Sequence, residues 1–413
     1  MKKSLLIMLK KFSNFKLFFS IAILAINFNG FGNGGFLKND LANTKISLIT
    51  CDPGNEVYSH FGHSAIRIQN INKKIDLVVN WGLFSFSEGQ LQFGYDFAKG
   101  RLNYFMGFQE MEKFILEYVE SKRSVREQEL NLNIEEKKEL LSIINENYKP
   151  ENREYRYEFF YDNCSSRIRD LIYSTLNEKL EWGKSNDANK YSFRKIIHNY
   201  LKYNPWLELG IDLVLGKRID ITVDNKNLMF LPNYMEEIID KSHIKENKTK
   251  RNLVLKKNQI INYKNLHREI PNISIYSWIT FIVTLLFLII KNEKLFSIWS
   301  SLNLSIIGIL GILLLFMWFG TDHQATKNNL NVLWASPFHF LLLYFIFSKK
   351  WSKISYWYIL IALTLIFTTI LFWFTLTQEL NPFVKPIILQ TGLIYYYYLR
   401  KNKFLINLNS TKD

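Results

Sequence analysis

Cysteine is nearly absent from this chain, since Cys51 and Cys164 are the only two among 413 residues. Two cysteines exclude a disulfide-stapled scaffold and a four-cysteine zinc site. One disulfide between them stays open if the chain is exported, whereas a catalytic Cys164 requires a free thiol.

The sequence also lacks a glycine-rich phosphate loop, an internal repeat and a sustained heptad. These absences exclude P-loop nucleotide binding, a solenoid and a coiled coil. Acidic residues are too few to balance the basic ones, which leaves a net charge of +15. Many of the lysines flank apolar segments, where membrane topology explains them, so we expect no nucleic-acid partner.

Apolar residues are unevenly distributed, because the last part of the chain is far more apolar than the rest. Residues 1–32 combine early lysines with the apolar run "FKLFFSIAILAINF" and a small-residue stretch. This pattern predicts a signal peptide or an uncleaved signal anchor. Either one places the residues that follow outside the cytoplasm.

A transmembrane domain of five helices is expected over residues 273–400, where apolar stretches recur between polar breaks. The connections "KNEK", "SKKWSK" and "RKNK" are rich in lysine, whereas "TDHQATKNN" and "TQELNP" are not. Lysine-rich loops stay in the cytoplasm, so the other two loops and residue 272 face outward, in agreement with the export signal. The expected spans are 275–290, 302–320, 333–347, 355–376 and 383–399.

Residues 236–272 contain the basic segment "KSHIKENKTKRNLVLKKNQ" and are expected to form a linker before the first span. A solvated linker is the simpler interpretation. The other is a segment that lies on anionic headgroups, which attract each lysine near the surface by about 1 kcal/mol.

Residues 40–235 are expected to form one extracytoplasmic domain of mixed α and β structure. "KISLITC" predicts a strand, and "SAIRIQNINKKIDLVVNWGLFSF" predicts two strands around the polar turn "NINKK". "MEKFILEYVESKR", "NIEEKKELLSIINENY" and "SSRIRDLIYSTL" have apolar residues at helical spacing. The last of these places Cys164 at or just before the N-terminus of a helix.

Cys164 is a candidate nucleophile because of this position. A thiol at a helix N-terminus meets the positive end of the helix dipole, which favours the thiolate, and free N–H groups that hold an oxyanion. A buried small hydrophobe is the commoner fate of a cysteine. The neighbouring residues are polar, however: Asp162, Asn163, Ser165 and Ser166.

His63 is the candidate base, because it leads a predicted strand and a rigid element suits a proton acceptor. Asn80, late on the next strand, is the candidate group that orients the imidazole, with Asp76 as the alternative. His60 is a neighbour of the site or an exposed residue. His60 and His63 also suit a metal by spacing, but no H-E-x-x-H pattern or third ligand accompanies them, so no metal and no cofactor are expected.

Other residues are weaker candidates for the site than Cys164 and His63. Tyr161 and Asn163, three residues and one residue before the cysteine, are candidates for supporting the site from behind the catalytic residues. Arg67 and Arg167 are candidates for gripping a phosphate, although a surface role is the commoner one. The remaining candidates are Tyr104 for an acyl groove, where core packing is the default, and His323 in an outer loop for the lipid or acceptor site.

The motifs "LITCDPGNEVYSHFGHSAIRI", "VVNWGLFSF", "FGYDFAKGRLNYFMG" and "YDNCSSRIRD" resemble the Lnb N-terminal periplasmic domain family. The apolar C-terminal region with "NNLNVLWASP" resembles the membrane part of the same proteins. The order His, polar residue, Cys also resembles the circularly permuted papain-like group, which includes lecithin retinol acyltransferase and relatives of NlpC-type peptidases. The resemblance implies an α+β, permuted papain-like (NlpC-like) periplasmic domain followed by a five-helix transmembrane domain.

Lnb proteins are lipoprotein N-acyltransferases, so the resemblance implies the same reaction here. Cys164 would take an acyl chain from a membrane phospholipid as a thioester, and His63 would move the proton. The acceptor would be the α-amine of a diacylglyceryl-cysteine lipoprotein. The implied location is the bacterial inner membrane, with the catalytic domain facing the periplasm.

Two other functions remain open from the sequence. One is a membrane-anchored, papain-like cell-wall peptidase or amidase, and the other is a non-catalytic membrane scaffold that binds lipid or a partner. The aromatic-rich segment and the five spans favour lipid over peptidoglycan, because a wall hydrolase needs only one anchor.

Overall fold

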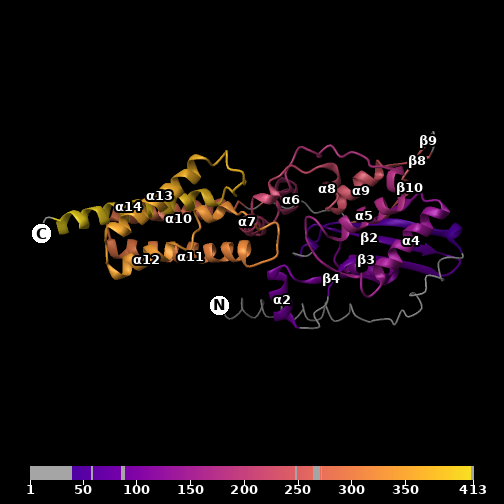
Figure 1. Cartoon of the computed structure of the whole chain (residues 1–413), viewed down its shortest axis with the longest axis horizontal. Helices are drawn as coiled ribbons and strands as arrows, with labels where there is room; N and C mark the ends of the chain where they lie inside the picture. Colours follow the sequence, from indigo (N-terminus) through magenta and orange to yellow (C-terminus); the bar gives the residue numbers. More distant parts are fainter. Residues whose placement is uncertain are drawn as a thin grey trace.

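The protein is described here by a computed structural model that covers residues 40–56, 59–84, 89–246, 249–263, 270 and 272–410. The export signal expected over residues 1–32 lies outside these described residues. An α+β domain and a bundle of apolar helices lie end to end along the long axis of the molecule (Figure 1).

The α+β domain is built on an antiparallel seven-stranded sheet with the order β10-β5-β1-β2-β3-β4-β6. The predicted strands around "KISLITC" and the turn "NINKK" are confirmed as β1, β2 and β3. The strands are β1 (Thr44–Cys51), β2 (His63–Asn70), β3 (Ile75–Leu83), β4 (Asn103–Glu110), β5 (Val125–Leu130), β6 (Glu154–Arg156) and β10 (Val254–Ile261).

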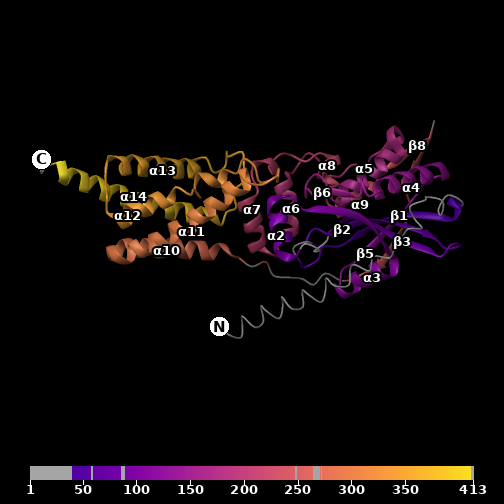
Figure 2. The same ribbon diagram turned by 60° about the horizontal axis from the view of Figure 1, so that its bottom comes forward.

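Helices cover both faces of this sheet, because its central strands are apolar on both sides. Ile66 and Val79 face the larger core, under α4 (Ile134–Tyr148), α5 (Cys164–Leu176) and α9 (Pro232–Asp240). Val78 faces a smaller core under α3 (Met111–Glu120), which Figure 2 shows on the opposite side of the sheet from α4 and α5. Burying such a side chain fully contributes about 1.5–3 kcal/mol, so both helix layers are held by the alternation of the strands.

The three predicted helices of this domain are confirmed as α3, α4 and α5. Asn133 begins α4 with a reciprocal capping box to Glu136, and the helix ends at Tyr148, before Pro150. Pro150 lacks a backbone N–H and disfavours a helical residue before it, which explains this end. The other elements of the domain are η1 (Leu41–Asn43), α2 (Gln90–Lys99), η3 (Asn177–Lys179), α6 (Phe193–Leu201), α7 (Pro205–Val214), η4 (Lys217–Ile219) and α8 (Asn225–Leu228).

The expectation of a linker over residues 236–272 is wrong for most of that range. β8 (His243–Glu246) and β9 (Thr249–Asn252) form a small antiparallel sheet with β7 (Leu180–Glu181), and β10 is an edge strand of the main sheet. The lysines of this segment resemble those of a solvated linker, but edge strands also commonly carry exposed charges. The sequence pattern therefore does not separate the two. β8 and β9 also lie at the end of the molecule away from the apolar helices (Figure 1), so this segment does not rest on headgroups beside them.

The helical domain follows the predicted apolar stretches, with shifted boundaries. Within the described residues, α11 and α13 are long and apolar enough to cross a membrane, while α10 and α12 are shorter apolar helices. The stretch expected over 333–347 is helical only from His339 onward, in α12, because the short η5 (Leu330–Leu333) ends where the stretch begins. The helices are α10 (Ser274–Ile290), α11 (Glu293–Phe319), α12 (His339–Ser348), α13 (Lys353–Leu371) and α14 (Val384–Ser410).

The loops after α11 and α13 join the helical domain to the α+β domain. The backbone N–H of Gly216 donates to Ala325 O at 2.9 Å, and Gln378 Nε2 donates to Leu215 O at 3.1 Å. These are the two lysine-poor loops, whereas the C-terminal end of α14 points away from the α+β domain (Figure 1). The arrangement agrees with the orientation predicted from the loop charges.

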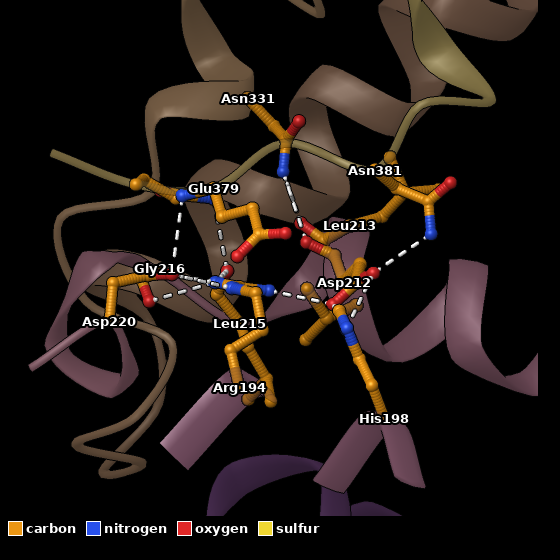
Figure 3. Close-up of polar contacts among 12 residues, drawn as sticks. Arg194, His198, Asp212, Leu213, Leu215, Gly216, Asp220, Asn331, Glu379 and Asn381 are labelled. Atoms are coloured by element: carbon orange, nitrogen blue, oxygen red, sulfur yellow. Dashed lines mark hydrogen bonds and ion pairs between the residues drawn. The ribbon is translucent and has the colours of Figure 1, made fainter. Parts of the chain in front are cut away.

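A buried polar network at this junction centres on Asp212 of α7 (Figure 3). Arg194 Nη1, from α6, donates to Asp212 Oδ1 at 2.8 Å, and its Nε donates to Asp220 Oδ1 at 2.8 Å. Asn381, from the loop after α13, donates through Nδ2 to Asp212 Oδ2 at 2.8 Å, and Asn331 donates to the Asp212 carbonyl at 3.2 Å. One carboxylate therefore binds side chains from both domains.

Removing the guanidinium from this network is expected to destabilise the protein strongly. Arg194→Met leaves two carboxylates without their charged partner in a site that is closed to water, which costs about 3–5 kcal/mol. Lys195→Met is the matched control, because Lys195 pairs across the same junction with Glu379 but is half-exposed, and such pairs contribute only about 0.2–1 kcal/mol. The midpoint of thermal unfolding of the full-length protein in detergent measures both, and equal shifts in the two variants would contradict the assignment.

Candidate functional site

Cys164 is the first residue of α5, as the sequence predicts. Asn163 caps the helix: its side chain accepts from the Ser166 N–H at 2.9 Å, and Ser166 Oγ accepts from the Asn163 N–H at 2.8 Å. Asn163 Nδ2 also donates to Phe230 O at 2.8 Å, which ties the cap to the core. The half-buried thiol is thereby fixed at the positive end of the helix dipole.

His63 is the first residue of β2 and lies beside Cys164, with which it forms a hydrogen bond. Gly62 precedes it with φ +85°, and a Cβ there would meet Cys51 O at 2.7 Å. Only glycine fits this turn without strain, and the turn delivers the imidazole to the end of the strand. α5 packs on one face of the sheet so that its first residue meets the first residue of β2.

The two groups shift each other's pKa toward an ion pair. Burial alone would raise the pKa of Cys164, but the charge and hydrogen bond of His63, the Ser64 backbone N–H and Ser165 lower it overall. Burial alone would lower the pKa of His63, but the charge and hydrogen bond of Cys164 and the hydrogen bond of Asn80 raise it overall. A thiolate next to an imidazolium is the reactive state of a cysteine nucleophile.

Of the two candidates for orienting the imidazole, Asn80 contacts His63 and Asp76 is bound elsewhere. Asn80 Oδ1 lies 3.0 Å from His63 Nε2, which leaves Nδ1 for the sulfur. Asn80 stands opposite Ala65 in the β2–β3 register, so its side chain shares a sheet face with His63 and reaches it along the diagonal. Asp76 is instead bound by Arg67.

Two residues that the sequence analysis did not identify continue this chain of hydrogen bonds. Asn80 Nδ2 donates to Gln109 Oε1 at 3.2 Å, and Gln109 Nε2 donates to Glu117 Oε1 at 2.6 Å. Gln109 belongs to β4 and Glu117 to α3. No motif marks either residue, because only the strand register and the packing of α3 bring them to Asn80.

Tyr155 is a third residue that the sequence analysis missed. It is 8% exposed, and its hydroxyl has no hydrogen-bond partner within the part of the chain that the structure describes. Burial raises its pKa, and the charge of Cys164 raises it further, so the hydroxyl keeps its proton close to the thiolate. A buried O–H donor of this kind suits a developing oxyanion.

Cys51 provides a contrast, since both cysteines are free. Burial raises the pKa of Cys51 to about 12, against smaller opposing effects from Tyr118 and Arg123. It lies in the smaller core beside Phe114 and Tyr118. Cys51 is therefore an inert core thiol, and the disulfide left open by the sequence is not formed.

The candidate phosphate-binding arginines are engaged with carboxylates. Arg67 makes a bidentate pair with Asp76, at 2.7 and 2.6 Å, and a third bond to Glu127 at 3.0 Å. Arg167 makes a bidentate pair with Asp162, at 2.6 and 2.7 Å, and its guanidinium carbon lies 3.8 Å from the Tyr155 ring centroid. Arg67 has a structural role, whereas Arg167 lies at the edge of the site.

The remaining candidates pack against aromatic side chains. Tyr104 is buried and stacks on Tyr157 with 4.4 Å between ring centroids, so it packs in the core. Tyr161 is partly exposed and contacts Phe193. His60 is half-buried, with its ring centroid 6.0 Å from that of Phe61.

His323 lies in the loop after α11, where it holds α2 rather than the thiol. Its Nε2 contacts Phe97 O at 2.9 Å. The adjacent Asp322 pairs with Arg101 at 3.0 Å and Arg156 at 3.3 Å. This outer loop therefore joins the two domains.

One group of potential metal ligands lies at the domain junction. His198, Glu208 and Asp212 have ligand atoms within 4.8 Å of one another. Asp212, however, already accepts from Arg194 and Asn381, and His198 Nε2 lies 2.9 Å from its Oδ1. A guanidinium on the same carboxylate disfavours a cation, so we assign this group to the junction network.

Fold and site together define a class: an antiparallel α+β domain with a cysteine–histidine–asparagine site, joined to a domain of apolar helices. Residues 36–199 match the family model of the Lnb N-terminal periplasmic domain, and residues 267–403 match that of the Lnb transmembrane domain. The chain belongs to the Lnb family and is a membrane protein with a periplasmic N-terminal domain. Searches of curated proteins and of solved structures gave no match.

The lowered pKa of Cys164 predicts selective alkylation. At neutral pH iodoacetamide should modify Cys164 much faster than Cys51, and the rate should fall only when the pH drops through the lowered pKa. In His63→Ala the thiol of Cys164 is still buried but has lost the charge of the imidazolium, so its pKa should rise. The rate of Cys164 alkylation at neutral pH should then fall about tenfold or more. Mass spectrometry of the alkylated protein across a pH series measures this, and an unchanged pH profile in His63→Ala would contradict the ion pair.

Proposed function

We propose that this protein is a lipoprotein N-acyltransferase that carries the acyl chain on Cys164. The observation that carries the proposal is the linked set Cys164, His63 and Asn80 in a domain that polar contacts hold to the membrane helices. A nucleophilic thiol in a domain that is fixed at the outer end of the membrane helices suits substrates that lie in the bilayer surface.

The first half-reaction transfers an acyl chain from a membrane phospholipid to the protein. The Cys164 thiolate attacks the ester carbonyl, and the new oxyanion accepts hydrogen bonds from N–H groups in the first turn of α5 and from the Tyr155 hydroxyl. The carbon–oxygen ester bond then breaks. His63 Nδ1 gives its proton to the departing alkoxide, which leaves a lysophospholipid and a thioester.

The second half-reaction transfers the acyl chain to the acceptor. The α-amine of a diacylglyceryl-cysteine lipoprotein attacks the thioester carbonyl, and the neutral His63 accepts one of its protons. The carbon–sulfur bond breaks, an amide forms, and the thiolate–imidazolium pair is restored. Nucleophilic catalysis of this kind divides one difficult transfer into two easier steps and requires no metal ion from the residues named.

The permuted papain-like relationship is part of this proposal. The order of the site along the chain is His63, Asn80 and then Cys164, with the cysteine at a helix N-terminus and the other two on neighbouring strands. Such an order is what a circular permutation of a cysteine-first papain-like domain produces. The same chemistry also serves a cell-wall peptidase, so the experiment must identify the acyl group on the sulfur.

Cys164→Ser should abolish N-acylation of a lipoprotein while the protein still inserts into the membrane, because a hydroxyl is a far weaker nucleophile than the thiolate. Cys51→Ala is the control and should keep the activity. Mass spectrometry of the lipoprotein N-terminus gives the result, and trapping a fatty-acyl thioester that is labile to neutral hydroxylamine identifies the intermediate. An unchanged triacylated product in Cys164→Ser overturns the proposal, and a peptidyl adduct in place of the fatty acyl group indicates the peptidase.

Tyr155→Phe should lower the turnover by about 10²-fold, because removing one oxyanion donor costs that order of magnitude. The variant keeps the ring that Arg167 covers, so the fold and the alkylation rate of Cys164 should change little. Tyr173→Phe, at an exposed position of α5, is the control. A Tyr155→Phe protein with normal turnover would remove the hydroxyl from the mechanism.

A further inference from the structure

The hydrogen-bond chain behind His63 ends on a carboxylate at the surface of the domain. It runs from His63 on β2 to Asn80 on β3, to Gln109 on β4 and to Glu117 on α3, with contacts of 3.0, 3.2 and 2.6 Å. By strand register, His63, Asn80 and Gln109 share the face of the sheet that α3 covers, and Glu117 belongs to α3. Burial of the carboxylate raises the pKa of Glu117, against the hydrogen bond from Gln109 and the charge of His63, which lower it. Because the residue is exposed, the ionised form is still the main one at neutral pH.

The two amide side chains in the middle of this chain, Asn80 and Gln109, can each donate toward either neighbour. A side-chain amide presents an acceptor oxygen on one side and a donor NH₂ on the other, and turning it by half a revolution exchanges the two. Asn80 and Gln109 therefore fit together in either sense, provided that both are turned. A further group at one end of the chain must therefore decide which way the two amides are turned.

Glu117 is that group, because an ionised carboxylate only accepts hydrogen bonds. It requires the NH₂ of Gln109 to face it, which turns the Gln109 oxygen toward Asn80. The Asn80 NH₂ then faces Gln109, and the Asn80 oxygen faces His63. The proton of the neutral imidazole is thereby placed on Nε2, and Nδ1 is left as the acceptor that faces Cys164.

We propose that Glu117 is a positioning residue that sets the direction of this chain and, through it, the tautomer of His63 at Cys164. The inference rests on the proposed function, in which Cys164 is the nucleophile. Glu117 acts through two amides and touches neither the thiol nor a substrate.

Reversing the chain would turn the Asn80 NH₂ toward His63 Nε2. The neutral imidazole would then carry its proton on Nδ1, where it can no longer accept the proton of the thiol. The imidazolium would also meet a donor in place of the Asn80 oxygen, which disfavours the ion pair. Both effects lower the reactivity of Cys164.

The test measures iodoacetamide alkylation of Cys164 at neutral pH in the full-length protein with Cys51→Ala. Glu117→Gln removes the fixed acceptor and should slow alkylation by about tenfold, the effect of losing one hydrogen bond to a charged group. Glu120→Gln, an equal loss of charge on an exposed position of the same helix, should leave the rate unchanged.

The decisive variant exchanges the two groups. In Gln109→Glu combined with Glu117→Gln, the carboxylate at position 109 accepts from Asn80 directly, so Asn80 keeps its direction. Alkylation should return to within about threefold of the starting protein, because the acceptor has only moved along the chain. Normal alkylation in Glu117→Gln, or an exchanged pair no faster than Glu117→Gln, overturns the proposal.

Alkylation reports the state of the thiol without any lipid or lipoprotein. If the protein with Glu117 intact fails to acylate a lipoprotein while the exchange restores alkylation, the proposed function fails and the positioning role stands. If acylation is normal and Glu117→Gln alkylates normally, the positioning role fails alone. The midpoint of thermal unfolding of each variant identifies any loss of rate that comes from loss of the fold.

Discussion

The contact between Cys164 and His63, on which the proposed chemistry depends, forms where the start of a helix meets the start of a strand. α5 begins at its cysteine, β2 begins at its histidine, and the helix packs so that the two first residues touch. The helix contributes its dipole and its free N–H groups, while the strand contributes a rigid base. A shift of either element by one residue would turn the group toward the core or the other face of the sheet.

The two faces of the sheet have different roles in this arrangement. One carries α5 and the larger core, which hold the thiol in position. The other carries α3 and the polar chain through Asn80, which orients the imidazole from behind. Because the nucleophile and the support of the base lie on opposite faces, substrate can approach the sulfur without displacing the groups that hold His63.

The junction with the membrane helices fixes where the site can work. Asp212 binds Arg194 from its own domain and Asn381 from an outer loop. Because Asp212 and Arg194 are buried, each must keep its partners, and this fixes the position of one domain relative to the other. The loop after α11 adds contacts through Asp322 and His323 to the region of α2. These contacts hold the α+β domain against the helical domain. Residues 236–272, which the sequence predicts as a linker, do not separate the two domains.

Local sequence patterns predict many of the strands and helices of this protein. Alternating apolar residues determined β1, β2 and β3, helical spacing determined α3, α4 and α5, and the polar stretch before "SSRIRDLIYSTL" placed Cys164 at a helix start. Long apolar runs and lysine-rich loops determined the helical domain and its orientation. Only the tertiary structure selected Asn80 over Asp76, added Gln109, Glu117 and Tyr155, and made β10 a strand of the sheet. Those outcomes depend on strand register and on packing between residues far apart in the chain, which no local pattern encodes.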